Sequence, residues 1–481
     1  MSTLEKLSEL ESRRAVIINS NTDGFDARKR ISTLLDENSF VEIGTFVKSR
    51  GTAFNLASID TPADGVITGY GTVFGRPVYV YSQDSKVLGG AIGEMHAKKI
   101  IRIYEEALKV GAPVVAFLST TGLRLQESID GLECYGRLYA TMIKASGKVP
   151  QIAVVNGDCG GGASFILGLS DYVFMNSKSA KVFLNSPNTM QIKEDSNDNI
   201  TSGKTQYEIT GLASIVDDDE CELISKVSTL LSYLPQNSKE TGPFYEIEDD
   251  LNRIDSALNN FDVESHSVKQ IVLSIVDKND IFELGSDYGK DTLTALARMD
   301  GGSVGVVANI DKRMSYKGVK KVSKFLKLCN TYNIPIITIT NIEGFESTVE
   351  TENLGIISEC SKMLKAFAKV DCPKINVIVG KAYGSGYVAM NSQMLGCDMT
   401  YAWPSAIVAP MEASSAVKIM YGDSIDDKTM LKDDFEKTLE EYETLASNAY
   451  ACAARGLIDD LIEPAATRKR VIAALQVLSQ K

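Results

Sequence analysis

Two glycine-rich turns decide the fold of this chain: Val155-Asn-Gly-Asp-Cys-Gly-Gly-Gly-Ala-Ser164 and Gly380-Lys-Ala-Tyr-Gly-Ser-Gly-Tyr-Val-Ala-Met390. Each turn follows an apolar run that predicts a buried strand, and each precedes a short segment that predicts a helix. Small residues let a ligand atom approach the backbone closely, and the first amides of a helix have no partner within it. Each turn is therefore a candidate pocket of backbone donors for a developing oxyanion.

Tight packing of a helix on a strand also selects small residues, so one such turn alone leaves both interpretations open. Neither turn matches G-x-x-x-x-G-K-[ST], the pattern of nucleoside-triphosphate loops. Because two equivalent turns occur, we favour the donor pockets. Two oxyanion pockets suggest that two carbonyl compounds are handled in one reaction.

The turns lie in two similar halves of the chain. Residues 31–44 resemble residues 272–285, with Asp36 matching Asp277. Three further landmarks keep their order and spacing: Pro113, Pro150 and Gly161 in the first half, and Pro335, Pro373 and Gly384 in the second. We infer an internal duplication with a boundary near residue 245, which predicts domains 1–245 and 246–481.

Each half alternates helix and strand. Apolar residues at helical spacing in 100–108 predict a helix with one buried stripe, and the apolar run 114–118 predicts a strand that is covered on both faces. The second half repeats this pattern at 319–326 and 336–340. The order of strand, crossover helix and strand predicts the α/β class.

Composition limits the function classes. The chain has 481 residues, a net charge of −13 and 44% apolar residues, as in an ordinary globular protein. The acidic balance argues against nucleic acid as a partner. No apolar run is long enough to cross a bilayer, and the first residues do not resemble a secretory signal. Eight cysteines without a C-x-x-C pair predict a reduced, cytoplasmic protein with no metal site.

Histidine is scarce, with only His96 and His266 in the chain. A histidine-based triad or proton shuttle would have to use one of these two residues. We expect the chemistry to depend instead on backbone dipoles or on a cofactor that another protein brings. Cys159 lies beside the first turn, but it has no histidine nearby in sequence, so packing is favoured over a role as a nucleophile.

The first turn resembles the oxyanion segment of crotonase-like proteins. The wider sequence resembles the carboxyltransferase subunit of biotin-dependent acyl-CoA carboxylases and decarboxylases, over nearly the whole chain. The stretches that carry this resemblance are 62–84, 89–99, 381–383, 398–404 and 450–468.

This resemblance implies two crotonase-like domains, each a spiral of ββα units. It also implies a hexamer, homomeric or mixed, in which the first domain of one subunit faces the second domain of another. An acyl-CoA would bind domain 1–245, and carboxybiotin would bind domain 246–481. The chain contains no biotinylation motif and no ATP-binding loop. The implied partners are therefore a biotin carboxyl carrier protein with a biotin carboxylase, or a membrane decarboxylase subunit.

The resemblance also implies site residues. The catalytic amides for the thioester and biotin ureido oxygens are those of Gly161 and Gly162, and of Ser385 and Gly386, respectively. The residues expected at the two ligands are Gly122, Arg124 and Ala163 for acyl-CoA, and Tyr383, Gly384 and Val388 for biotin. Biotin released from its carboxyl group would take the α-proton of the acyl-CoA, so no side-chain base is needed.

Three segments depart from the family pattern. The loop Ser119–Arg124 keeps only Gly122 and Arg124 of an acidic-Ser-Gly-Gly-Ala-Arg motif, which predicts a reshaped acyl-CoA pocket. The second turn has Gly-Ser-Gly where Gly-Gly-Ala is common, and backbone donation survives that change. The polar segment 191–211 is either a lid or a surface loop.

Several alternatives remain open. The same oxyanion pockets would serve carboxylation of an acetyl- or propionyl-type CoA, or decarboxylation of malonyl-, methylmalonyl- or glutaconyl-CoA. A hydratase or isomerase of the crotonase type would need a positioned carboxylate, which neither turn offers. A non-catalytic paralogue that only builds a mixed assembly would account for the altered Ser119–Arg124 loop.

Overall fold

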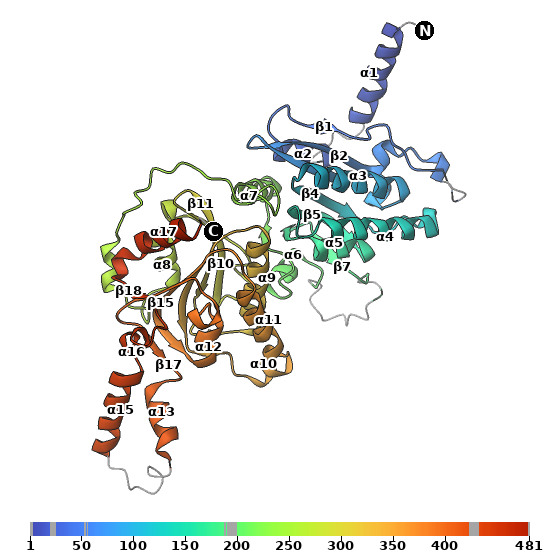
Figure 1. Cartoon of the computed structure of the whole chain (residues 1–481). Helices are drawn as coiled ribbons and strands as arrows, with labels where there is room; N and C mark the ends of the chain where they lie inside the picture. Colours follow the sequence, from blue (N-terminus) through green and yellow to red (C-terminus); the bar gives the residue numbers. More distant parts are fainter. Residues whose placement is uncertain are drawn as a thin grey trace. The chain divides into compact units, whose positions relative to one another are not determined.

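The computed structural model describes residues 3–19, 26–51, 54, 56–186, 189, 200–422 and 432–479. The chain divides into two compact units, Met1–Glu240 and Thr241–Lys481. Each unit is built around one eight-stranded sheet with helices packed on it (Figure 1). Among the described residues, no helix combines the length and apolar character that crossing a membrane requires.

The sheet of the first unit runs in the order β1-β2-β3-β4-β5-β6-β8, and β7 also pairs with β5. The first three strands are antiparallel neighbours, and the pairs from β3 onward are parallel. The strands are β1 Val41–Glu42, β2 Val66–Val73, β3 Arg76–Gln83, β4 Val114–Thr120, β5 Gln151–Gly160, β6 Tyr172–Asn176, β7 Lys181–Phe183 and β8 Ile215–Asp217. The helices are α1 Thr3–Asn19, α2 Ala27–Leu34, α3 Glu94–Val110, α4 Ser128–Ala145, α5 Phe165–Leu169, α6 Gly203–Glu208 and α7 Glu220–Tyr233.

The main sheet of the second unit runs in the order β9-β10-β11-β13-β15-β16-β18, and β17 also pairs with β15. Two short strands, β12 and β14, form a separate pair. The strands are β9 Ile281–Glu283, β10 Thr292–Met299, β11 Gly302–Asn309, β12 Arg313–Met314, β13 Ile336–Ile342, β14 Gly344–Phe345, β15 Lys374–Tyr383, β16 Met399–Ala402, β17 Ile407–Ala409 and β18 Asp460–Leu461. The helices are α8 Val268–Ile275, α9 Tyr316–Thr331, α10 Val349–Asn353, α11 Ile356–Ala368, α12 Gly384–Ala389, α13 Ala413–Met420, α15 Lys432–Ala446, α16 Ala449–Ala453 and α17 Thr467–Leu478.

The two main sheets have the same strand order and the same directions, which confirms the predicted α/β class and the duplication. Even their irregularities correspond. The β4–β5 register shifts between Leu118 and Thr120, and the β13–β15 register shifts between Thr340 and Ile342. In each unit this bulge lies beside the end of the strand that leads into a glycine turn.

The matched aspartates of the two halves have the same task. Asp36 accepts hydrogen bonds from the amides of Phe74 (3.0 Å) and Gly75 (2.8 Å), which form the β2–β3 turn. Asp277 accepts from the amides of Asp300 (3.3 Å) and Gly301 (2.9 Å), which form the β10–β11 turn. All four turn residues have positive φ, as in a type I′ turn, so each hairpin depends on an aspartate that is distant in sequence.

Two buried lysines also correspond. Lys99 on α3 donates to the carbonyls of Ala63 (2.8 Å) and Val66, and Lys321 on α9 donates to the carbonyl of Gly285 (3.1 Å). Burial lowers the pKa of both amines to about 8. Each lysine thereby fixes its helix to the segment that connects the first two strands of its sheet.

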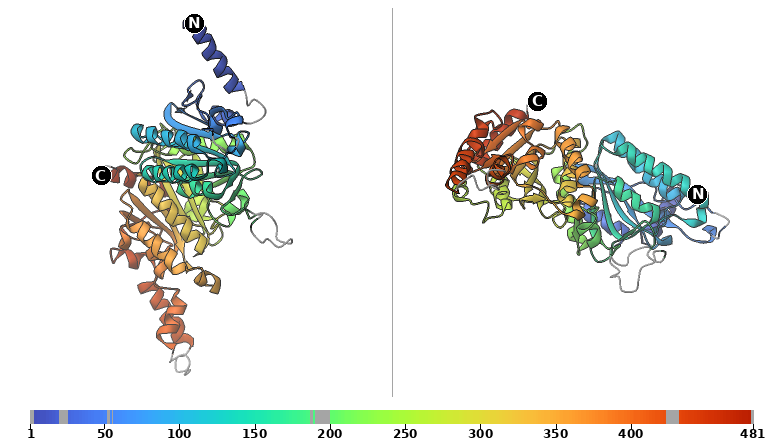
Figure 2. Two further views of the ribbon diagram at one scale, coloured as in Figure 1. Left: turned by 90° about the vertical axis from the view of Figure 1, so that its right-hand side faces the viewer. Right: turned by 90° about the horizontal axis from the view of Figure 1, so that it is seen from below.

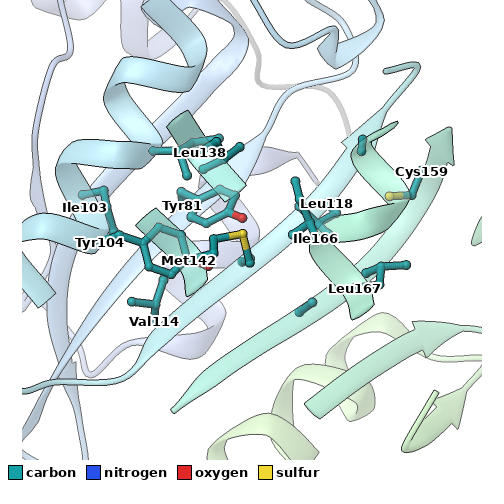
Figure 3. Packing of buried hydrophobic residues seen from close by; sticks show 14 of the residues in the cluster. Tyr81, Ile103, Tyr104, Val114, Leu118, Leu138, Met142, Cys159, Ile166 and Leu167 are labelled. Atoms are coloured by element: carbon teal, nitrogen blue, oxygen red, sulfur yellow. The ribbon is translucent and has the colours of Figure 1, made fainter. Parts of the chain in front are cut away.

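The cores contain the residues that the helical and strand patterns predicted. In α3 the stripe residues Ile100, Ile103 and Tyr104 are buried, and the helix ends at Gly111 in the left-handed conformation. All seven residues of β4 are buried, as expected for a strand that is covered on both faces. Figure 3 shows this core, in which Cys159 of β5 belongs to the same apolar cluster.

The second unit contains a helical hairpin that has no counterpart among the described residues of the first unit. Helices α13 and α15 pack against each other and form a hairpin that projects from the rest of the unit (Figure 2). The single tryptophan, Trp403, lies in the core of this unit, and its indole Nε1 donates to the hydroxyl of Thr467 (3.0 Å).

The twin aspartates allow a matched stability test. Asp277 also pairs with the buried guanidinium of Arg468 at 2.7 Å, whereas Asp36 has only hydrogen bonds. We expect Asp277→Asn to lower the free energy of unfolding of its unit by about 3 kcal/mol, because it leaves a buried cation poorly compensated. Asp36→Asn should cost about 1 kcal/mol. Urea unfolding followed by hydrogen exchange in each unit measures both losses, and equal losses would contradict the assignment.

Candidate functional site

The first turn joins β5 to the helical segment that begins at Gly161. Gly161 has φ +60°, and a Cβ built on it meets no atom within 4 Å, so the turn faces open space. The hydroxyl of Tyr139 donates to the carbonyl of Gly162 (2.7 Å), and that of Ser164 donates to the carbonyl of Gly161 (2.8 Å). Both carbonyls are thus held in place, and the amides of Gly161 and Gly162 precede the hydrogen bonds of the helical segment.

Aromatic side chains support this turn from α4 and α5. The ring centroids of Tyr135 and Tyr139 are 5.6 Å apart, and those of Tyr139 and Phe165 are 6.0 Å apart. Burial raises the pKa of Tyr139 to about 12, so its hydroxyl remains a proton donor at neutral pH. Phe165 is half exposed at the rim of the turn.

The loop Ser119–Arg124 lies against this turn. A Cβ on Gly122, which has φ +108°, would lie 3.0 Å from the carbonyl oxygen of Gly160. The amide of Thr121 donates to the carbonyl of Gly89 (3.0 Å), and the carbonyl of Gly122 accepts from the amide of Ile92 (2.8 Å). The predicted residues Gly122, Gly161 and Gly162 are therefore brought together.

Arg124 has a different position from the one expected. Its side chain is fully buried, and its Nη1 lies 2.6 Å from Asp64 Oδ1 and 2.9 Å from Glu127 Oε1. Its Nη2 donates to the carbonyl of Ala91 (2.9 Å). Because both terminal nitrogens are engaged inside the unit, the guanidinium holds the loop, and the amide of Arg124 likewise donates to the carbonyl of Ile92 (3.0 Å). Burial raises the pKa of Asp64.

The second turn joins β15 to α12. Gly384 has φ +50°, and a Cβ on it would lie 2.8 Å from the carbonyl oxygen of Pro410. The amides of Ser385 and Gly386 lie in the first turn of α12 and have no partner within that helix. A cavity of about 380 Å³ opens here, lined by Tyr383, Gly384 and Ser385 among others. Val388 is partly exposed on α12 and does not line this cavity.

When the sequences of the two turns are aligned, Gly161 corresponds to Gly384, and both glycines are in the left-handed conformation. This equivalence pairs Gly162 with Ser385 and Ala163 with Gly386. The predicted donor pairs, Gly161 with Gly162 and Ser385 with Gly386, are thus displaced by one position between the halves. Ala163 is fully buried, backbone included, so it presents no exposed atom to a ligand.

Polar side chains beneath each turn escaped the sequence analysis. In the first unit, Gln83 Oε1 accepts from the amide of Ser119 (3.1 Å), and a Cβ on Gly157 would lie 2.4 Å from Ser119 Oγ. In the second unit, Asn309 Oδ1 accepts from the amide of Asn341 (3.3 Å), and Asn341 Oδ1 accepts from that of Lys381 (3.0 Å).

Gly380 packs closely against the side chain of Asn341, as Gly157 packs against that of Ser119. A Cβ on Gly380 would lie 2.5 Å from Asn341 Oδ1. The only signal in the sequence was the repetition of these two glycines at the same distance before each turn.

Four side chains of alternating charge form ion pairs with one another beside the second turn. Lys381 Nζ lies 2.8 Å from Glu343 and 3.5 Å from Glu264, and Lys312 pairs with Glu264 and lies 3.9 Å from Glu343. The hydrogen bond to Glu343 raises the pKa of Lys381, and the one from Lys312 lowers the pKa of Glu264. We call these four residues the charge ring.

The remaining candidates are structural. His96 is fully buried, with Nδ1 2.9 Å from the carbonyl oxygen of Asp64 and Nε2 3.2 Å from Gln83 Nε2, and burial lowers its pKa. His266 is exposed and stacks on Phe261. Cys159 is fully buried in the apolar cluster of the first unit, and this burial raises its pKa to about 12, which favours packing over nucleophilic use.

Two expectations concern other parts of the chain. In the segment 191–211, residues 191–199 lie outside the described part of the chain. Within the described residues, no group of three or more His, Cys, Asp or Glu side chains is placed to hold a metal ion.

Comparisons with known proteins agree with this geometry. The family model of the carboxyl transferase domain matches residues 24–481. The methylmalonyl-CoA decarboxylase subunit alpha of Propionigenium modestum is 38% identical over 466 residues, which cover 95% of this chain and 90% of that protein. The methylmalonyl-CoA carboxyltransferase 12S subunit of Propionibacterium freudenreichii subsp. shermanii is 37% identical over 470 residues, which cover 95% of this chain and 88% of that protein.

A solved structure of the transcarboxylase 12S hexamer with hydrolysed methylmalonyl-coenzyme A bound has the same fold. The two chains align with a TM-score of 0.95 and 34% sequence identity, over 100% of this chain and 96% of the other. The chain therefore belongs to the carboxyl transferase family, and the resemblance inferred from its first turn and from five further stretches of sequence is confirmed.

Proposed function

We propose that this chain is the carboxyltransferase subunit that exchanges a carboxyl group between biotin on a separate carrier protein and the α-carbon of an acyl-CoA of propionyl size. The observation that carries the proposal is the pair of equivalent turns, each with backbone amides at the start of a helix. The acyl size rests on the relatives, which are named for methylmalonyl-CoA.

The first turn serves the thioester. The amides of Gly161 and Gly162 donate to the thioester oxygen, which becomes negatively charged when the α-carbon loses its proton or its carboxyl group. Tyr139 and Ser164 hold the carbonyls of the turn, so the donors do not have to reorganise during the reaction. Gly122 borders the acyl group, and Arg124 holds the loop that carries Gly122 from inside the unit.

The second turn serves biotin. The amides of Ser385 and Gly386 donate to the ureido oxygen, while Tyr383 and Gly384 line the cavity of about 380 Å³. Gly344 leaves the wall of this cavity open, because a Cβ on it would meet no atom within 4 Å. The charged and polar lining of the cavity suits a small polar ring. Carboxylated biotin, when bound, supplies the carboxyl group and a basic nitrogen for the α-proton.

We place the two turns of one site on different copies of the chain. Exposed apolar side chains flank both turns, on η4 (Leu125–Glu127), α4 and α5 in the first unit and on α10, α11 and α12 in the second. They are Leu125, Ile129, Leu132 and Phe165, and Val349, Leu354, Ile357 and Val388. Patches of this kind are typical of interfaces, and the 12S relative is a hexamer.

Carboxylation and decarboxylation use the same donors, so both directions stay within the proposal. The decarboxylase direction is supported by the relative from Propionigenium modestum. We expect a biotin carboxyl carrier protein as partner, together with a biotin carboxylase or a membrane decarboxylase subunit. A cytoplasmic location is consistent with the eight free cysteines.

The proposal predicts carboxyl transfer without any metal added to this chain. Purified chain, incubated with carboxylated carrier protein and propionyl-CoA, should form methylmalonyl-CoA, measured by mass spectrometry. Parallel reactions with acetyl-, malonyl- and glutaconyl-CoA define the acyl preference and the direction. Transfer to or from none of these thioesters would refute the proposal, and acyl-CoA binding without transfer would favour a non-catalytic assembly subunit.

Removing one donor at the second turn should slow the reaction. Ser385→Pro deletes the amide hydrogen, and proline is tolerated in the first turn of a helix. We expect kcat to fall by about 100-fold or more. Ser385→Ala keeps the amide and should cost less than about tenfold. Calorimetric binding of acyl-CoA at the first turn should be unchanged in both variants, and equal kcat values for the two would contradict a role for this amide.

If the exposed apolar side chains beside the two turns form the subunit interface, a charge placed there should reduce assembly and activity together. Ile129→Asp or Ile357→Asp places a charge in the proposed interface, so light scattering should show smaller species and transfer should fall in parallel. Val477→Asp on α17 is the matched control, because Val477 is as exposed as Ile357. A hexamer that persists in both variants would refute this placement of the interface.

A further inference from the structure

The cavity at the second turn is lined by charged residues that differ from those at the equivalent positions of the first unit. It is lined by Arg313, Glu343, Lys381 and Glu412 together with the residues of the turn. By register, Glu343 and Lys381 correspond to Thr121 and Asp158 in the first unit. The shared scaffold therefore does not require these charges, and they are candidates for recognising the ligand of this turn alone.

Glu343 is held on one side of the cavity by the charge ring. Its Oε1 lies 2.8 Å from Lys381 Nζ and 3.9 Å from Lys312 Nζ. Glu264 completes the ring by pairing with both lysines. The amide of Glu343 also donates to the carbonyl of Lys312 (2.7 Å), so its backbone and its carboxylate are both fixed.

Arg313 lines the same cavity but does not belong to the charge ring. Among the residues that the structure describes, no carboxylate forms an ion pair with its guanidinium. Yet Arg313 pairs in register with Gly344, the neighbour of Glu343. Arg313 and Glu343 also both line the cavity at the second turn, so Glu343 would be within reach of Arg313 if the lysines released it.

We propose that Arg313 recognises the carboxylate of the group transferred at the second turn, and that the charge ring keeps Arg313 available by holding Glu343 away from it. This inference rests on the proposed function. An arginine is always charged, and its planar fork binds a carboxylate through two parallel hydrogen bonds. Arg313 thus distinguishes carboxylated biotin, which carries that anion, from biotin without it.

The first test measures this discrimination. Arg313→Ala should raise the KM for carboxylated carrier protein about tenfold, while the inhibition constant of uncarboxylated carrier and the affinity for acyl-CoA stay unchanged. Arg313→Lys keeps the charge without the fork and should lie in between. Lys320→Ala, an exposed cation on α9 that lines none of the cavities at this turn, is the matched control.

The second test separates the ring from the arginine. Lys381→Met releases Glu343 toward Arg313 and should raise the KM for carboxylated carrier as much as Arg313→Ala does. Adding Glu343→Gln to Lys381→Met removes the competing carboxylate and should restore the KM. If the double variant stays as poor as Lys381→Met, Lys381 acts on the ligand directly and the proposal is wrong.

A binding measurement completes the test without relying on turnover. Surface plasmon resonance at low temperature compares immobilised carrier before and after carboxylation. Wild type should bind the carboxylated form more tightly, and Arg313→Ala should bind the two forms equally. Equal binding by wild type overturns this inference, whereas an absence of carboxyl transfer in wild type overturns the proposed function instead.

Discussion

Both halves of this molecule depend on a reversal of the backbone at the end of a buried parallel strand. At Gly161 and Gly384 the chain enters the left-handed region and passes directly from strand to helix. Without a Cβ, this turn leaves backbone amides at the surface of a close-packed unit. The polar contacts beneath it, from Gln83 and Ser119 or from Asn309 and Asn341, fix the strand end from which the turn starts. Preorganised donors of this kind can stabilise negative oxygen with little movement.

Duplication has kept this scaffold and let its electrostatics diverge. Strand order, bulge positions and the aspartates that close each hairpin are common to both units. The first turn is bordered by a loop that Arg124 anchors from inside the unit. The second lies beside the charge ring, whose Glu343 and Lys381 are replaced by Thr121 and Asp158 in the first unit. A shared backbone with different charges is what two different ligands in one reaction require.

Local sequence patterns predicted the elements and the turns. Helical spacing in 100–108, the runs before each turn and the repeated landmarks led to the right class, because such signals depend only on neighbouring residues. The family came from the resemblance of longer stretches, such as 62–84 and 450–468, to known carboxyltransferase subunits. Arg124 was assigned to the acyl-CoA because its loop resembles a family motif. Its guanidinium instead pairs with Asp64, which is 60 residues away. The donors were also placed one position apart in the two halves, since small residues alone do not mark where a helix begins.

The sequence by itself determined that the chain is duplicated, that it is α/β, and that only two histidines are available for any chemistry. Spacing and composition are enough for these conclusions, because they reflect periodicity and residue chemistry along the chain. Only the tertiary structure decided which charges meet at each turn. Glu264, Lys312, Glu343 and Lys381 come from four separate segments. Ion pairs form wherever folding places side chains within a few ångströms of each other, and separation along the chain carries no information about that distance.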